Sequence, residues 1–439
     1  MSPVAEKTPS LIAALEQRPQ GGPRWLDDLR ARGAARFSAL GIPTVRDEEW
    51  RFTSVAPIAA TEFRPAPPLT ASAVALDSVL YADAPVRVAV VNGRFSDELS
   101  RLDGLPRGVK AGSLAAAIVE HPDVVQRYFG QIADFGTRSF VALNTAFVQD
   151  GAFVYLPDGA VLETPIELLF VSAANGAATI SHPRVLIVAE AGSQVRLVET
   201  YVGAGGTYFA NAVSEIFVGE NAVVDHYKVQ QETFDAFHVG SLHVHTARSA
   251  NFSSHSFSVG GRLVRNDIVA ILDGEGGDCT LNGLYLADRD RLIDNHTQID
   301  HAKPHCGSHE VYKGILGGKA KAVFNGKIVV RPDAQKTDAK QTNRALLLSD
   351  DATINTKPQL EIFADDVKCT HGAAIGQLDE DAIFYLRARG LTFAEARDML
   401  IHAFAGQILE RVQIEPLRQA LETELFAQLA RDLAEVDSR

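Results

Sequence analysis

The sequence predicts a mainly β protein, in which a parallel β-helix (a solenoid) is flanked by N-terminal and C-terminal helical regions. Three observations predict this fold: a turn motif that recurs about every 30 residues, β-branched runs between the turns, and apolar stripes at helical spacing near both ends. They divide the chain into a mostly helical region over 1–140, a β-helix over 141–378 and a helical domain over 379–439.

The turn motif consists of an apolar or β-branched residue, three turn-like residues and a small residue. The small residue falls at Ala160, Gly192, Ala222, Ala250, Gly276, Ala320 and Ala352. The steps are similar except for the longer one from Gly276 to Ala320, where we expect an insertion between coils. A period near 30 residues is typical of solenoids, and a propeller blade would need about 40. Stacked coils of a β-helix therefore fit best.

The segments between the turns favour strands. RVLIVAE, AVSEIFVG and KAVFNGKIVV are rich in β-branched residues and show no sustained helical period. Helical repeats are therefore excluded. The run Val86 to Val91 (VRVAVV) predicts a further buried strand within the N-terminal region.

Helices are indicated at both ends of the chain. Leu26, Leu29, Phe37 and Leu40 lie near helical spacing, followed by a stop signal at Gly41 and Pro43. Near the C-terminus, Thr392 and Glu395 form a capping box. Two apolar stripes follow, Ala396, Leu400, Phe404, Ile408 and Val412, then Leu417, Leu421, Leu425, Leu429 and Leu433. These helices either cap the solenoid or also offer a docking face for a partner.

Composition limits the partners and the compartment. The 439 residues carry a net charge of −13, which argues against a nucleic-acid or anionic-membrane partner. Three cysteines without a CxxC pair fit a reducing compartment. Because the N-terminus lacks an apolar signal region and no apolar stretch could span a bilayer, we expect a cytoplasmic protein.

The strongest chemical signal is the segment Phe363 to Asp379 (FADDVKCTHGAAIGQLD). If it is extended, Cys369 and His371 lie on one face, because side chains alternate along a strand. A thiolate beside an imidazole binds transition metals or iron-sulfur clusters, although a lone cysteine is most often a small buried hydrophobe. Since a cluster needs about four ligands, this pair predicts half of a site that another subunit completes.

Other candidate sites are weaker. The stretch Asn295 to Glu310 contains His296, His301, His305, Cys306 and His309, but their spacing matches no zinc motif. We expect ordinary polar positions in the insertion there, and no role follows for Cys279 or Cys306. No phosphate-binding loop is present, so we expect the chain to bind no nucleotide.

Several long motifs carry a family resemblance. ADDVKCTHGAAIGQLD, FYLRARGL, VYKGILGGKAKAVFNGKIVV and AQKTDAKQTNRALLLS resemble the SufB/SufD family of iron-sulfur cluster assembly proteins. Within that family, the segment GIPTVRDEEWRFTSV (Gly41 to Val55) resembles the SufD type.

The resemblance implies a right-handed parallel β-helix and a non-enzymatic scaffold subunit of a SufBCD complex. It implies that the last coils pair with a SufB-like subunit, that the C-terminal helices dock the SufC ATPase, and that Cys369 and His371 lie where a transient iron-sulfur cluster is shared with SufB. Whether the isolated chain forms a homodimer stays open. The alternative is a secreted-type β-helix enzyme acting on polysaccharide, which would need a stripe of acids and bases on one strand face.

Overall fold

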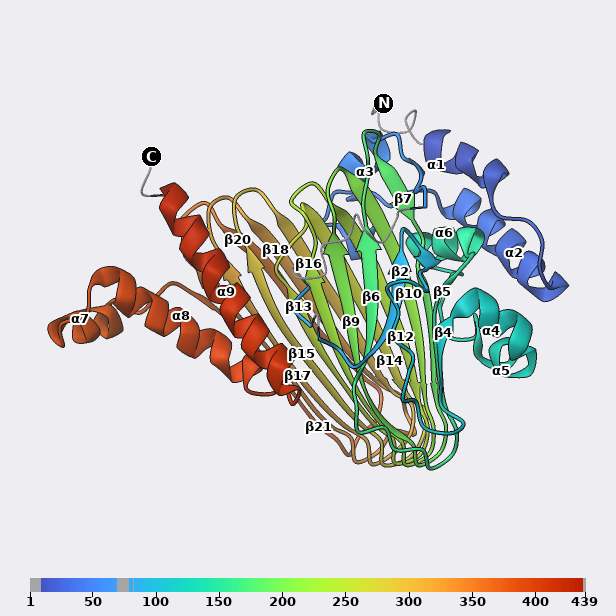
Figure 1. Cartoon of the computed structure of the whole chain (residues 1–439). Coiled ribbons are helices and arrows are strands. Elements are labelled where there is room, and N and C mark those ends of the chain that lie inside the picture. The colour runs from blue at the N-terminus through green and yellow to red at the C-terminus, as the bar shows by residue number, and fades with distance from the viewer. Residues whose placement is uncertain (1–8, 69–78, 82, 437–439) are drawn as a thin grey trace.

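A computed structural model describes residues 9–68, 79–81 and 83–436 (Figure 1), with the side chains of 426 and 428–436 left aside. Two long sheets face each other and form a parallel β-solenoid, with helices packed on the outside. The predicted fold class is confirmed.

The larger sheet, sheet A, has 11 strands in the order β20-β18-β16-β14-β12-β10-β8-β5-β4, with β7 and β1 at its side. Its strands are β1 (Arg64–Pro65), β4 (Lys110–Ser113), β5 (Gly151–Leu156), β7 (Thr179–Ser181), β8 (Arg184–Ala189), β10 (Tyr208–Val218), β12 (Phe237–Thr246), β14 (Leu263–Leu272), β16 (Leu292–His301), β18 (Lys321–Val330) and β20 (Thr353–Ile362).

The second sheet, sheet B, has 10 strands in the order β21-β19-β17-β15-β13-β11-β9-β6-β2-β3. Its strands are β2 (Val86–Val91), β3 (Arg94–Phe95), β6 (Ile166–Ser172), β9 (Gln194–Gly203), β11 (Val223–Gln231), β13 (Asn251–Ser258), β15 (Asp278–Ala287), β17 (Gly307–Leu316), β19 (Asp338–Leu347) and β21 (Lys368–Gly376). The strand predicted at Val86 to Val91 is thus confirmed as β2, a fully buried member of this sheet.

The chain alternates between the sheets, so each strand from β8 onward pairs in parallel with the strand two further on. In the lumen between the sheets, every second side chain of each strand points inward, and one apolar core formed there includes Leu197, Ile216, Ile268 and Phe324, with polar residues such as Glu199 at other inward positions. The other side chains face outward, where the helices cover them.

The corners explain the repeat. Where the chain passes from sheet A to sheet B, one residue has a positive φ between 53° and 73°; these are Gly159, Gly192, Asn221, Ser249, Gly276, His305 and Lys336. A tight left-handed residue followed by a small one lets each corner stack on the last.

The expected insertion between Gly276 and Ala320 is wrong. The series of corners continues from Gly276 to His305 without a gap, and Cys306 takes the place of the small residue. The turns at Ala320 and Ala352 instead belong to the opposite corners, where the chain returns from sheet B to sheet A. Both kinds of corner share a similar sequence pattern. The motif positions change from one kind of corner to the other between Gly276 and Ala320, so the step between them is longer by half a coil and resembles an insertion.

N-terminal helices cover the outer face of sheet A (Figure 1). They are α1 (Pro9–Ala14), η2 (Leu15–Gln17), α2 (Arg24–Leu40), η3 (Glu48–Trp50), α3 (Ala56–Ala60), α4 (Leu114–Glu120), α5 (Pro122–Tyr128) and α6 (Ser139–Phe147). Helix α2 ends where the sequence predicts, because Gly41 follows it with a φ of 66°.

The C-terminal helices are α7 (Glu380–Ala388), α8 (Phe393–Leu409) and α9 (Glu415–Val436). The predicted capping box of Thr392 and Glu395 opens α8. From the two stripes, Ile408, Leu417, Leu421 and Leu425 pack on the outer face of sheet B, whereas the side chains of Leu429 and Leu433 lie outside the described residues. Helices α8 and α9 therefore cover a side of the solenoid, and α7 extends away from it (Figure 1).

A buried ion network fixes the 41–55 segment to sheet A. The guanidinium of Arg265 donates to Asp267 at 2.8 Å, to Asp294 at 2.6 Å and to the carbonyl oxygen of Glu49 at 2.8 Å. Its plane also lies 4.2 Å from the ring centroid of Trp50. One arginine thus bridges two buried carboxylates and holds the N-terminal segment in place.

We predict that Arg265→Ala lowers the free energy of unfolding by about 3–5 kcal/mol, because two carboxylates lose their shared cation. Urea denaturation measures this loss. The matched control is Arg24→Ala, whose side chain is 95% exposed and pairs only with Asp28; it should change the free energy by less than about 0.5 kcal/mol. Equal effects of the two substitutions would contradict the role given to the network.

Candidate functional site

Cys369 and His371 lie on β21, the last strand of sheet B. In the register with β19, Cys369 is opposite Ala339 and His371 opposite Gln341, and both of these partners are buried on the lumen side. The two predicted site residues therefore do share one face, and that face is the end of the lumen. No further coil follows, so β21 and β20 leave the end of the solenoid open.

The two side chains differ in exposure. Cys369 is half-buried against a small apolar cluster that includes Val330 and Ala339, while His371 is exposed. Burial raises the pKa of the Cys369 thiol, an effect that the backbone N–H of Ala339 partly opposes. Burial thus favours the protonated form of the thiol.

The described residues contain no group of three or more His, Cys, Asp or Glu side chains placed to hold a metal ion. The Cys369 and His371 pair can therefore provide two ligands at an open edge, where approximately four are needed for a cluster.

The histidines from His296 to His309 are not brought together. His296 faces outward from β16 and contacts Asp294 at 3.0 Å and Glu49 at 3.3 Å. His301 faces the lumen and contacts the hydroxyl of Ser308 at 2.9 Å. His305 occupies a corner and His309 is exposed on β17. These residues belong to two regular strands and the corner between them, not to an insertion.

The other two cysteines have structural positions. Cys279 is fully buried in the core of the lumen, and burial raises the pKa of its thiol. Cys306 is the small residue of its corner, and its thiol donates to the carbonyl oxygen of Gly274 at 3.2 Å.

A second surface of interest lies on α7 and the start of α8. Phe384, Tyr385, Phe393 and Met399 are 75%, 57%, 54% and 50% exposed. Exposed large apolar side chains of this kind are candidates for contact with a partner. We call these four residues the α7–α8 patch.

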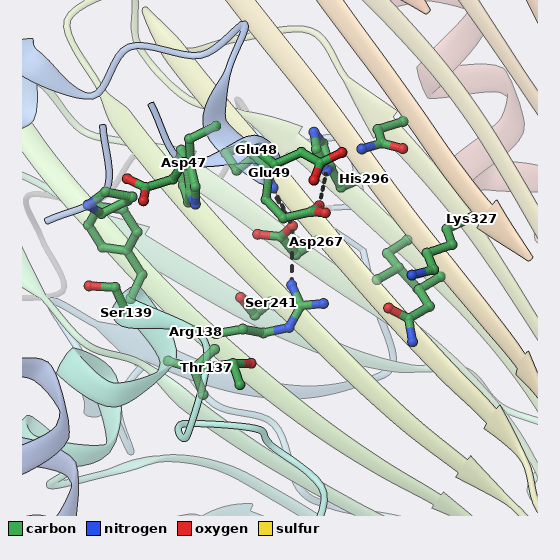
Figure 2. A pocket seen from close by; sticks show the side chains of 18 of the residues that line it. Asp47, Glu48, Glu49, Thr137, Arg138, Ser139, Ser241, Asp267, His296 and Lys327 are labelled. Carbon is green, nitrogen blue, oxygen red and sulfur yellow. Dashed lines mark hydrogen bonds and ion pairs between the residues drawn. The ribbon is translucent and has the colours of Figure 1, made fainter. Parts of the chain in front are cut away.

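Sequence reasoning missed a pocket of about 460 Å³ between the 41–55 segment, the start of α6 and the outer face of sheet A (Figure 2). Its floor is a row of polar residues in register on neighbouring strands: Ser241, Asp267, His296 and Asn325. In the sequence, the signal for this floor is the recurrence of polar residues at outward strand positions one coil apart. The walls come from residues 47–50 and 137–141, too distant in sequence to be assigned to the same site.

The pocket is lined by charges of both signs that largely neutralise one another. Arg138 reaches Asp267 at 3.5 Å, and Glu49 contacts His296, as the dashed lines of Figure 2 show. The hydrogen bond from His296 lowers the pKa of Glu49, although burial acts in the opposite direction. Burial lowers the pKa of His296, but the neighbouring Asp294 raises it, and the pKa is raised overall. Both shifts favour the charged form of the pair, which joins the N-terminal segment to β16.

Across the described part of the chain, no helix is both long and apolar enough to cross a membrane.

Comparisons with known proteins indicate the family of the chain. The family model for the SufBD core domain of the SUF system for FeS cluster assembly matches residues 170–404, and the model for the SufBD N-terminal region matches 19–168. An iron-sulfur cluster assembly SufBD family protein of Synechocystis is 36% identical over 404 residues, covering 89% of each chain. The iron-sulfur cluster assembly protein SufD of Escherichia coli is 31% identical over 389 residues, covering 86% of this chain and 87% of its own. SufD of Bacillus subtilis is 29% identical over 429 residues, covering 91% and 93%. The chain therefore belongs to the SufB/SufD family of iron-sulfur cluster assembly proteins and is of the SufD type.

Proposed function

We propose that this chain is a non-catalytic scaffold subunit of a cytoplasmic complex that assembles iron-sulfur clusters. It pairs with a SufB-like subunit through the open end of the solenoid and contributes Cys369 and His371 to a cluster that the two subunits hold transiently. The observation that carries the proposal is the position of these two residues on β21, the edge strand of sheet B, which pairs with β19 on one side only among the described residues.

An open sheet edge supports the proposed pairing. The backbone N–H and C=O groups on the free side of β20 and β21 have no strand to bond with, and such an edge readily binds another strand. Apolar side chains are exposed there as well: Ile362, Phe363 and Ile375 are 39%, 62% and 47% exposed. A SufB-like subunit would cover these groups and bring the missing ligands, and in its absence a second copy of the chain would pair through the same edge.

The C-terminal helices are proposed to dock a SufC-type ATPase through the α7–α8 patch. The chain itself carries no phosphate-binding motif, so hydrolysis of ATP is assigned to that partner. Lys313 on β17 anchors the base of α8, donating to the carbonyl oxygen of Phe404 at 2.7 Å. A movement of the docked ATPase would therefore act directly on a strand of sheet B.

Family membership argues against the alternative function, that of an enzyme acting on polysaccharide.

We predict that Cys369→Ala or His371→Ala lowers cluster formation by the reconstituted complex at least about tenfold, since each removes a metal ligand. The amount of cluster is measured by visible absorption and Mössbauer spectra after anaerobic reconstitution with SufB-like and SufC-like partners. Thr370→Ala is the matched control, because this exposed residue lies between the two on the opposite face of β21. Complex formation should survive in all three variants, and undiminished cluster formation in both test variants would refute the assigned role.

A second prediction concerns the α7–α8 patch. Phe384→Asp should abolish co-purification of the ATPase with tagged protein, because a charge replaces an apolar contact. Val119→Asp is the control: Val119 is also 75% exposed but lies on α4, which covers sheet A. If Phe384→Asp keeps the ATPase, or Val119→Asp loses it equally, the docking surface lies elsewhere.

A further inference from the structure

One buried carboxylate differs from all the others in the described part of the chain. The others each contact an arginine or a histidine: Glu167 with Arg87, Glu199 with His226, Glu215 with Arg184, Glu232 with His238, Asp267 and Asp294 with Arg265, Asp288 with Arg291, and Asp300 with Arg331. Glu310 is only 1% exposed and forms no ion pair with any described residue. An ionised carboxylate without a cation is costly to bury, so this exception calls for an explanation.

Glu310 projects into the lumen from β17. One of its oxygens, Oε2, accepts a hydrogen bond from Nε2 of Gln341 at 2.7 Å, and the other, Oε1, is buried without a partner. Burial raises the pKa of Glu310 to about 7, although Thr297 and Gln341 act in the opposite direction. Its carboxyl group is thus largely neutral below about pH 7.

The neighbouring titratable groups are also neutral. Burial raises the pKa of Cys279 and Tyr285 on β15 and of Tyr312 on β17. Burial lowers the pKa of His301 on β16 to about 4. The inward side chain of β19 that adjoins Glu310, Gln341, does not titrate. Nothing charged on these strands therefore compensates an ionised Glu310.

The polar surroundings of Glu310 extend to the open end. Oε1 of Gln341 and Oδ1 of Asn343 on β19, and Nδ2 of Asn295 on β16, are also buried without a hydrogen-bond partner. Buried polar atoms are normally paired, so these unpaired atoms mark the last coils as a polar part of the lumen, in addition to the hydrogen-bonded polar group of the middle coils.

The register places Glu310 directly behind the cluster half-site. Glu310 on β17 pairs with Gln341 on β19, and Gln341 pairs with His371 on β21. Neighbouring strands lie about 4.8 Å apart, so the backbones at Glu310 and His371 are separated by roughly 10 Å. Across that distance of protein interior, a divalent cation favours the ionised form of a carboxyl group.

We propose that Glu310 is a buried charge-compensating acid of the half-site: its carboxyl group is neutral while Cys369 and His371 are free, and it ionises when a ferrous ion binds there. This inference rests on the proposed function. The proton leaves Glu310 through the polar row of Gln341 to the open end of the lumen, so the carboxylate gains one negative charge as the cation arrives. Gln341 is the positioning residue between them.

The first experiment is infrared difference spectroscopy on the full chain without metal. The wild type should show the C=O stretch of a buried protonated carboxyl that disappears as the pH rises through about 7, and Glu310→Gln should lack this band. Glu199→Gln is the matched control, because Glu199 is also buried in the lumen but contacts His226, and its pKa is lowered to about 2. This control should keep the band.

Thermal unfolding gives an independent measurement. Because the folded chain retains a proton on Glu310 that the unfolded chain releases, the wild type should lose stability relative to Glu310→Gln as the pH rises from about 4.5 to about 7. If Glu310 is already ionised at pH 5, both the band and this loss will be missing, and the inference is overturned.

The second experiment adds ferrous ion anaerobically to the complex of the full chain with a SufB-like partner at pH 6. Binding of ferrous ion should remove the carboxyl band of the wild type. In the double variant Cys369→Ala/His371→Ala, the band should remain when ferrous ion is added. A band that persists while ferrous ion binds through Cys369 and His371 would overturn the inference and leave the proposed function standing. Binding that does not depend on these two residues would refute the proposed function, and the inference with it.

Discussion

The structure depends on one constraint, the in-register parallel pairing of each strand with the strand of the next coil. Because every coil repeats the same register, an inward residue is followed at the same place by another inward residue, coil after coil. Side chains of similar character therefore lie in rows along the solenoid axis. The apolar rows form the core of the lumen, the polar floor of the pocket is one outward row, and Glu310, Gln341 and His371 are consecutive members of an inward one.

The outer faces of the two sheets are both covered by helices, which come from opposite ends of the chain. Sheet A buries its outer side chains under the N-terminal helices, and sheet B buries its own under α8 and α9. On sheet A, pairs such as Arg184 with Glu215 at 2.6 Å fix these contacts where charges are enclosed. Ion pairs of this kind add little stability over an apolar contact but allow only one arrangement. They specify where the N-terminal region lies on the solenoid, and the walls of the pocket follow from that placement.

Much of this architecture could be predicted because its signals are local. A left-handed residue followed by a small one marks a corner, VRVAVV marks a buried strand, and Thr392 with Glu395 marks the start of α8. The same locality caused the error at Gly276, since the two kinds of corner share a pattern and only the pairing of strands separates them. Cys369 and His371 were found because alternation along a single strand sets their common face.

Glu310 and the pocket could not be found in this way. In the sequence, the glutamate within GSHEVYKGIL is an ordinary strand residue, and only the pairing shows that no described residue beside it is a cation. Likewise, Glu49 and His296 meet only because the N-terminal segment packs back onto β16. Their interactions depend on contacts between distant segments, for which a single sequence carries no signal.

The two ends of the solenoid are not equivalent. At the N-terminal end, the outermost strands are β3 and β4, which are 2 and 4 residues long and run antiparallel to their neighbours. At the C-terminal end, β20 and β21 present full-length edges of 10 and 9 residues. A body with a single adhesive end forms pairs and stops, whereas two such ends would polymerise into fibres. The asymmetry of the ends therefore limits the stacking of this chain on itself along the axis to two solenoids.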